Sequence, residues 1–131
     1  MKKIPMTSIR QDWKTPKALY QALNAEFGFD HDPCPALKKN QAWVNGLLSD
    51  WGKSNFINPP FKGIEKWVAK GYQEWKQGKT CVFLIPSRTD TRWWHDYCMK
   101  ASEIRFIKGR LKYDDGKFNA PFPSCVVVFN G

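Results

Sequence analysis

The run from Thr80 to Ile85 (Thr-Cys-Val-Phe-Leu-Ile) limits the fold of this chain more than any other segment. It is almost wholly apolar and ends at Pro86, which is typical of a strand buried on both faces of a sheet. A second run, Ser124 to Phe129, is rich in β-branched residues and predicts another strand. A sheet with such strands needs covering layers, which the rest of the chain must supply.

Helical and strand-like patterns alternate along the first three quarters of the chain. Such alternation predicts an α/β fold with a mainly parallel sheet covered by helices. The last strands follow each other without a helix, so we expect them to form an antiparallel hairpin. Residues 34–50 are irregular or weakly helical in pattern. The other expected elements are helices over 16–27, 63–77 and 90–99, capped by Thr15 at the first and Asp90 at the third, and strands over 29–32, 55–57 and 103–107.

Composition and charge narrow the class of protein. The 131 residues suit a single domain over 1–131, with a loose basic arm at 1–11. No apolar run is long enough for a membrane span or signal peptide, and the four cysteines form no CxxC pair, so we expect a cytoplasmic protein with reduced thiols. A net charge of +9 with 15% aromatic residues favours nucleic acid as the partner.

Three polar segments follow predicted strands and should meet at one edge of the sheet. They are Asp32-Pro33-Cys34, Asn58-Pro59-Pro60-Phe61 and Pro86-Ser87-Arg88. Ligands of open α/β sheets bind beyond the carboxyl ends of the strands. We therefore expect the functional site at this edge.

The Asn58-Pro59-Pro60-Phe61 turn carries the most chemical information. Its prolines stiffen the backbone, and the carbonyls of Asn58 and Pro59 join the Asn58 side-chain oxygen as hydrogen-bond acceptors. Such a fork suits the amino group of a planar base, and Phe61 offers a face for the ring to stack on. The plain alternative is a Pro-Pro turn that caps the next helix.

Several blocks of the chain together resemble one family. With the Asn58 turn, they make the sequence similar to DNA amino-methyltransferases, and more narrowly to the phage DNA N-6-adenine-methyltransferase (phage Dam) family, from about Asp12 to Phe129. The other blocks, in order, are Trp13-Lys14-Thr15-Pro16, Phe29-Asp30-His31-Asp32-Pro33-Cys34, Asp50-Trp51, Ile85 to Thr91 with Trp94-His95, Gly109-Arg110-Leu111-Lys112 and Ala120-Pro121-Phe122-Pro123-Ser124.

The resemblance implies transfer of a methyl group from S-adenosylmethionine (AdoMet) to adenine N6 in DNA. Asn58 and the Pro59 carbonyl would hold the target amine in a turn completed by Pro60, and Phe61 would stack on the base. It also implies a minimal Rossmann-like AdoMet-dependent methyltransferase sheet with an antiparallel C-terminal hairpin, and a phage or prophage origin in a bacterial host.

The resemblance also implies a cofactor site. Thr15-Pro16 is similar to the block where a helix N-terminus takes the methionine carboxylate, and the plain alternative is a helix cap. Asp32, followed by Pro33, would bind the methionine ammonium group. Asp50 is placed like the residue that recognises the cofactor's adenine.

The expected cofactor site departs from the usual methyltransferase pattern. The turn after Asp32 has no glycine, and only 25 residues separate Asp32 from Asn58, so the first half of the sheet should be shortened. We expect a shallow pocket that binds AdoMet weakly, or one that a second protomer, as in a homodimer, or the DNA completes.

Contacts to DNA should come from basic and aromatic residues near the same edge. Low sequence specificity is expected, because no insertion is available for base readout. His95 has no metal-ligating partner at suitable spacing, so we expect no metal. The candidates for DNA contact are Arg88, Arg92, Trp93 or Trp94, the basic stretch Arg105, Lys108, Arg110 and Lys112, and Phe122, which would enclose the base or close the hairpin.

Three rival functions remain open from the sequence. Pro33-Cys34 is the nucleophile motif of cytosine-C5 methyltransferases, but no Glu-Asn-Val partner is present. Glu74 and Lys76 match a nuclease Glu-x-Lys pair, although in a helix they point to different faces. The third rival is a catalytically inactive DNA-binding module that retains the methyltransferase fold.

Overall fold

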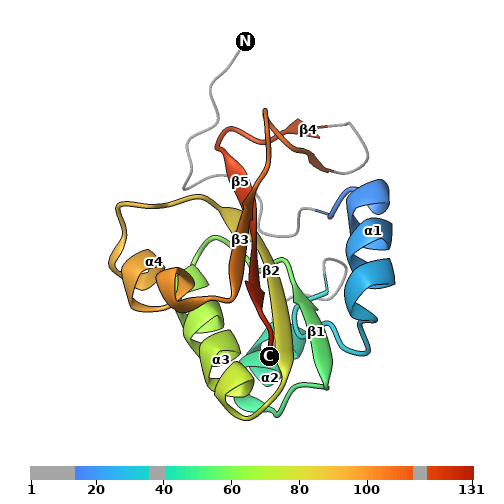
Figure 1. Cartoon of the computed structure of the whole chain (residues 1–131), viewed down its shortest axis with the longest axis vertical. Coiled ribbons are helices and arrows are strands. Elements are labelled where there is room, and N and C mark those ends of the chain that lie inside the picture. Colours follow the sequence, from blue (N-terminus) through green and yellow to red (C-terminus); the bar gives the residue numbers. More distant parts are fainter. Residues whose placement is uncertain (1–13, 36–40, 114–117) are drawn as a thin grey trace.

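The protein is an α/β sandwich whose helices lie on both faces of one sheet (Figure 1). The computed structural model describes residues 14–35, 41–113 and 118–131, so the expected arm at 1–11 lies outside the described residues. No helix in those ranges is long and apolar enough to cross a membrane. The elements are α1 (Lys17–Phe27), α2 (Gln41–Leu48), β1 (Ser54–Ile57), α3 (Ile64–Lys76), β2 (Thr80–Pro86), α4 (Arg92–Asp96), η2 (Cys98–Lys100), β3 (Glu103–Phe106), β4 (Phe118–Asn119) and β5 (Ser124–Phe129).

The sheet has the strand order β1-β2-β5-β3. Strand β1 is parallel to β2, with Ile57 opposite Phe83. Strand β5 is antiparallel to both β2 and β3, and Ser124 at its start lies opposite Pro86 at the end of β2. The antiparallel pairing of the last strands is confirmed. The expectation of a mainly parallel sheet is wrong, because β5 inserts between β2 and β3 and makes two of the three strand pairs antiparallel.

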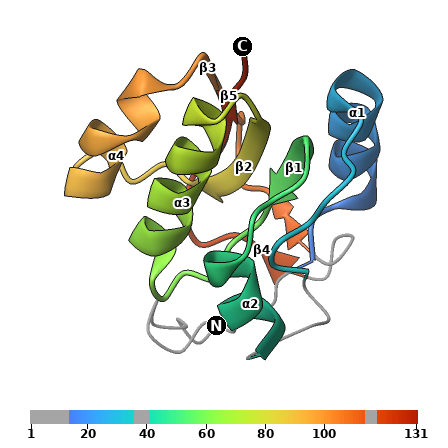
Figure 2. The same cartoon turned by 90° about the horizontal axis from the view of Figure 1, so that it is seen from below.

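Side chains alternate between two buried clusters, one on each face of the sheet. On β2, Phe83 and Ile85 face the cluster under α3 and α4, whereas Val82 and Leu84 face the cluster under α1. Strand β5 alternates in the same way over its whole length. Figure 2, seen from below, shows α1 on one side of the sheet and α3 with α4 on the other. Strands β2 and β5 are almost continuously apolar because both faces of the sheet are covered by other parts of the chain.

The segment before the Asp32 turn lies beside β1. His31 forms a parallel bridge with Asn55, and the Phe56 N–H donates to the His31 carbonyl over 3.1 Å. Asp30 accepts hydrogen bonds from the backbone of Ser54 at 3.1 Å. The strand expected over 29–32 is thus reduced to a single bridge, but it runs in the expected direction and brings Asp32 to the carboxyl edge.

The caps expected for two helices are wrong. The N-cap position of α1 is Pro16, so Thr15 does not cap this helix. Helix α4 is capped by Thr91, whose hydroxyl accepts from the Trp94 N–H at 3.3 Å, and not by Asp90. Residues 41–48 form a full helix, α2, where only weak helical pattern was visible.

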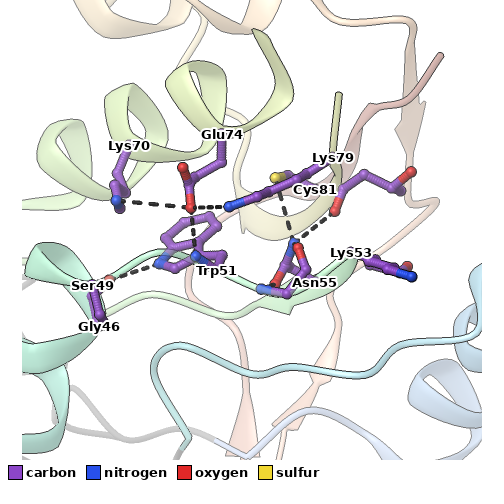
Figure 3. Close-up of polar contacts among 12 residues, drawn as sticks. Gly46, Ser49, Trp51, Lys53, Asn55, Lys70, Glu74, Lys79 and Cys81 are labelled. Atoms are coloured by element: carbon purple, nitrogen blue, oxygen red, sulfur yellow. Dashed lines mark hydrogen bonds and ion pairs between the residues drawn. The ribbon is translucent and has the colours of Figure 1, made fainter. Parts of the chain in front are cut away.

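A buried carboxylate fastens the loop before β1 to α3. Glu74 is 1% exposed, accepts a hydrogen bond from the Trp51 N–H at 2.5 Å, and pairs with Lys79 at 2.9 Å (Figure 3). Burial by itself would raise the pKa of Glu74, but the Trp51 N–H, the Lys79 ammonium and the charge of Lys70 together lower it. This anchor fixes β1 against α3 and so fixes where the next turn begins.

Replacing Glu74 should weaken the fold in a pH-dependent way. Glu74→Gln removes the charge that pairs with Lys79 and should lower the free energy of unfolding by about 2–4 kcal/mol at pH 7. Since the folded state lowers the carboxyl pKa, the wild-type advantage should be complete above the ordinary pKa of 4.5 and be lost as the pH falls through the lowered pKa of the folded state. Chemical denaturation at pH 7 and pH 3.5 measures both values. An equal difference at the two pH values would contradict this role.

Candidate active site at the carboxyl edge of the sheet

The Asn58 turn leaves β1 at the carboxyl edge of the sheet and is built into the core. Pro59 and Pro60 are buried, whereas Asn58 and Phe61 are half-buried. The Ile64 N–H donates to the Phe61 carbonyl at 3.3 Å, so the turn runs directly into α3. The prolines contribute no N–H, and the turn therefore presents acceptors at the edge where ligands of such sheets bind.

Aromatic rings pack beside this turn. Phe61 meets Phe122 edge to face, with ring centroids 5.0 Å apart. The rings of Phe122 and Tyr113 also pack together, with centroids 6.5 Å apart. Phe122 and Tyr113 are 4% and 1% exposed. Of its two expected roles, Phe122 therefore closes the hairpin hydrophobically, and Phe61 is the ring of this pair that keeps an accessible surface. Tyr113 has no signal in the sequence beyond being aromatic.

Thr15 and Asn58, 43 residues apart in the chain, meet at this edge. The Asn58 Nδ2 donates to Thr15 Oγ1 over 3.1 Å. Thr15 precedes Pro16, which restricts it to extended backbone, so its side chain is held just ahead of α1. The block expected to hold the cofactor thus contacts the residue expected to hold the target amine.

Asp32 and Cys34 form the neighbouring part of the edge. Asp32 Oδ1 accepts from the Cys34 N–H at 3.0 Å, and Asp32 as a residue is exposed. Desolvation by the protein around it raises the pKa of Asp32 to about 6, and the Cys34 N–H offsets part of this rise. The carboxyl group is therefore poised to change charge near neutral pH.

Cys34 is a structural thiol. It is 2% exposed, and burial, reinforced by the negative charge of Asp32, raises its pKa well above the usual value. A hydrogen bond from the Asn58 backbone N–H lowers the pKa but does not offset this rise, and it ties Cys34 to the Asn58 turn. A buried, neutral thiol is a poor nucleophile. Cytosine-C5 methylation needs a cysteine nucleophile, so the burial of Cys34 argues against that reaction.

The second rival also loses its support. Glu74 is committed to Trp51 and Lys79 inside the fold. Among the described residues, no group of three or more His, Cys, Asp and Glu side chains could hold a metal ion. A nuclease site built on Glu74 therefore has no basis in this part of the chain.

Asp50 lies away from the other candidate residues. It comes before β1, directly ahead of Trp51, whereas Asn58 follows β1 at the opposite end of that strand. Trp51 is held there by Glu74 and by the Gly46 carbonyl, which accepts from its indole N–H at 2.6 Å. Asp50 and the Asn58 turn thus lie at opposite ends of β1, and the cofactor role of Asp50 stays a prediction.

Pro33 is buried against α2, and a glycine makes this possible. A Cβ on Gly46 would lie 2.1 Å from the Pro33 carbonyl oxygen, so only glycine allows the helix to approach this closely. Gly46 could not be singled out from the sequence, because no sequence pattern shows that α2 packs on the Asp32 turn. The other proline of the expected cofactor site, Pro16, is half-buried at the start of α1.

The candidates for DNA contact separate into surface and core residues. Arg92 and Arg110 are exposed and Arg88 is half-buried, and none of them pairs with a carboxylate that the structure describes. Trp94 is 2% exposed and packs in the core, which corrects its expected stacking role, whereas Trp93 keeps an accessible surface. Arg105 is held by Glu26 and Glu103, at 2.5 and 2.9 Å, so it does not belong with the available arginines.

Comparison with known proteins gives the family of this chain. No curated protein and no solved structure matches the chain. A model of the family described as DNA N-6-adenine-methyltransferase (Dam) matches residues 3–125, which include Thr15, Asp32 and the Asn58 turn. The chain therefore belongs to the DNA N-6-adenine-methyltransferase family.

Proposed function

We propose that this protein transfers the methyl group of AdoMet to the N6 amine of adenine in DNA, at many short or degenerate sites. The observation that carries the proposal is that Asn58 bonds to Thr15 through its side chain and to Cys34 through its backbone N–H, while the Cys34 N–H donates to Asp32. This arrangement joins an amine-holding group and a cation-binding group through one residue, Cys34.

The residues present fit one end of AdoMet better than the other. Asp32 is exposed at the edge and can hold the methionine ammonium group, and the start of α1 at Pro16 offers backbone for the carboxylate. Asp50, which was expected at the adenosine, lies ahead of β1, at the end opposite the Asn58 turn. We therefore expect weak binding by an isolated chain, strengthened by DNA or by a second protomer.

The chain's own residues would prepare the target amine. AdoMet supplies an activated methyl group on its sulfonium. Asn58 Oδ1 and the Pro59 carbonyl accept hydrogen bonds from the adenine amine and orient its lone pair. These acceptors stabilise the positive charge that grows on the nitrogen as it is methylated. Phe61, supported by buried Phe122, provides a ring against which the base can stack.

Replacing Asn58 tests the proposed role of the turn. Asn58→Ala removes the side-chain acceptor and should lower turnover by about 100- to 1,000-fold, because the lost interaction strengthens in the transition state. Mass spectrometry of nucleosides from treated DNA identifies the product. Thr80→Val, at the amino end of β2 and so at the opposite end of the sheet from the Asn58 turn, is the control. If the wild-type protein made only N4- or C5-methylcytosine, the proposal would be contradicted. If the wild-type protein bound DNA but made no methylated product, an inactive DNA-binding module would be favoured.

Acidification should weaken AdoMet binding. The pKa of Asp32 is raised to about 6, so the carboxylate that attracts the ammonium group is progressively lost below that pH. The dissociation constant, measured by calorimetry, should rise toward tenfold for each pH unit below 6. Asp32→Asn should bind more weakly at pH 7.5 and lose this pH dependence. Equal pH dependence in the two proteins would contradict the assignment.

Recognition of DNA should be mostly electrostatic. The exposed Arg92 and Arg110, with Arg88 and the net charge of +9, suit phosphate contacts, which carry no direct sequence information. Discrimination then comes from the base pocket and at most one or two neighbouring bases.

Methylation mapping by long-read sequencing tests this specificity. DNA modified to completion should carry N6-methyladenine in many sequence contexts, and DNA binding should weaken steeply as salt rises. Arg110→Gln should flatten the salt dependence without changing the contexts that are methylated. Methylation confined to one site of five or more bases would show that a base-reading element exists in the chain.

A further inference from the structure

We infer that Thr15 is a positioning residue that orients the Asn58 amide for the target amine, and not a ligand of the cofactor. The inference deepens the proposed function and rests on it. It starts from one contact, the 3.1 Å hydrogen bond from Asn58 Nδ2 to Thr15 Oγ1.

The orientation of the Asn58 amide decides whether the turn can hold an amine. A carboxamide presents an acceptor, Oδ1, on one side and two donors on Nδ2 on the other, and the two ends have almost the same shape. An adenine amine donates hydrogens, so only Oδ1 can receive it. In the observed arrangement Nδ2 is directed to Thr15, so Oδ1 points away from Thr15, on the other arm of the carboxamide.

The hydrogen bond also strengthens Oδ1 as an acceptor. Donation from Nδ2 shifts electron density through the conjugated amide toward its oxygen, since linked hydrogen bonds polarise one another. The effect of Thr15 should therefore reach the amine through Asn58, without contact between Thr15 and the base.

The chain around these two residues limits the freedom of both. Pro16 restricts the backbone of Thr15, and the buried Pro59 and Pro60 fix the chain after Asn58. The Asn58 backbone N–H is held by Cys34. Because both backbones are restrained, the hydrogen bond to the Thr15 hydroxyl holds the amide in the observed orientation.

Thr15→Val tests the role with little change of shape. At saturating AdoMet and DNA, the single-turnover rate of N6 methylation should fall by about 10- to 100-fold, whereas the AdoMet dissociation constant should change by less than about threefold. Thr15→Ser, which keeps the hydroxyl, should restore the rate to within about threefold of wild type. Thr15→Ala repeats the loss with a smaller side chain, should the valine variant fold poorly.

Thr80→Val is a matched control. It also removes a hydroxyl that is bonded to an asparagine, Asn130 at 2.9 Å, but at the amino end of β2. Its methylation rate should equal that of wild type. Thermal unfolding of each variant separates loss of folding from loss of rate.

A second substitution isolates the coupling between Thr15 and Asn58. Asn58→Asp places two equivalent acceptor oxygens at this position, so no orientation remains to be selected. Thr15→Val should therefore lower the rate much less when it is combined with Asn58→Asp than when it is made in the wild-type chain, a non-additive result.

Three results would overturn the inference. They are an unchanged rate in Thr15→Val, weaker AdoMet binding by the same factor as the loss of rate, or an equal loss in both backgrounds. The wild-type protein is the separate test of the proposed function, since absence of N6-methyladenine from its product would contradict that proposal whatever Thr15 does.

Discussion

Strand β2 pairs with β1 on one side and with β5 on the other, and the position of the candidate site depends on this double pairing. The register places Ile57 opposite Phe83 and Ser124 opposite Pro86. Because β1 leaves the sheet where β5 enters it, the Asn58 turn and the Phe122 segment meet at one edge. The contact between Phe61 and Phe122, at 5.0 Å, follows from that meeting.

A small fold achieves this by giving single elements two tasks. Helix α1 covers one face of the sheet through Leu23, and Thr15, two residues before the helix, contacts Asn58 at the candidate site. Cys34 fills the core under α2 and also holds the Asn58 backbone. Substitutions in the core near the site should therefore disturb chemistry as well as stability.

The sequence predicted β1, β2, β3 and β5 and the Asn58 turn because their signals are local. Proline after an apolar run ends a strand wherever the rest of the chain lies, and strand β5 has the bounds expected for it. Insertion of β5 between β2 and β3 could not be predicted, since alternation of side chains is the same whichever strand lies alongside. The position of Trp94 could not be predicted either. A tryptophan next to arginines can stack on a DNA base or pack in the hydrophobic core, and only the tertiary structure shows that Trp94 is buried.

Site residues that act through long-range contacts were the hardest to interpret. Thr15 has the residue type and the neighbouring proline of a helix cap, yet its hydroxyl accepts a hydrogen bond from a residue 43 positions away. Asp50 follows an expected spacing, but the chain between Asp32 and β1 folds into α2 and carries Asp50 to the other end of the strand. Spacing along a chain predicts proximity only when the intervening elements are known.

A crystal structure of the protein with S-adenosylhomocysteine, the demethylated product, would test the central claim most directly. That claim is that Thr15, Asp32 and the Asn58 turn form one methyl-transfer site at the carboxyl edge of the sheet. The account predicts density for the ligand at this edge, in contact with Asp32, with the Thr15–Asn58 hydrogen bond retained. Ligand bound at the amino end of β1 beside Asp50, or Thr15 bonded to the ligand in place of Asn58, would contradict it.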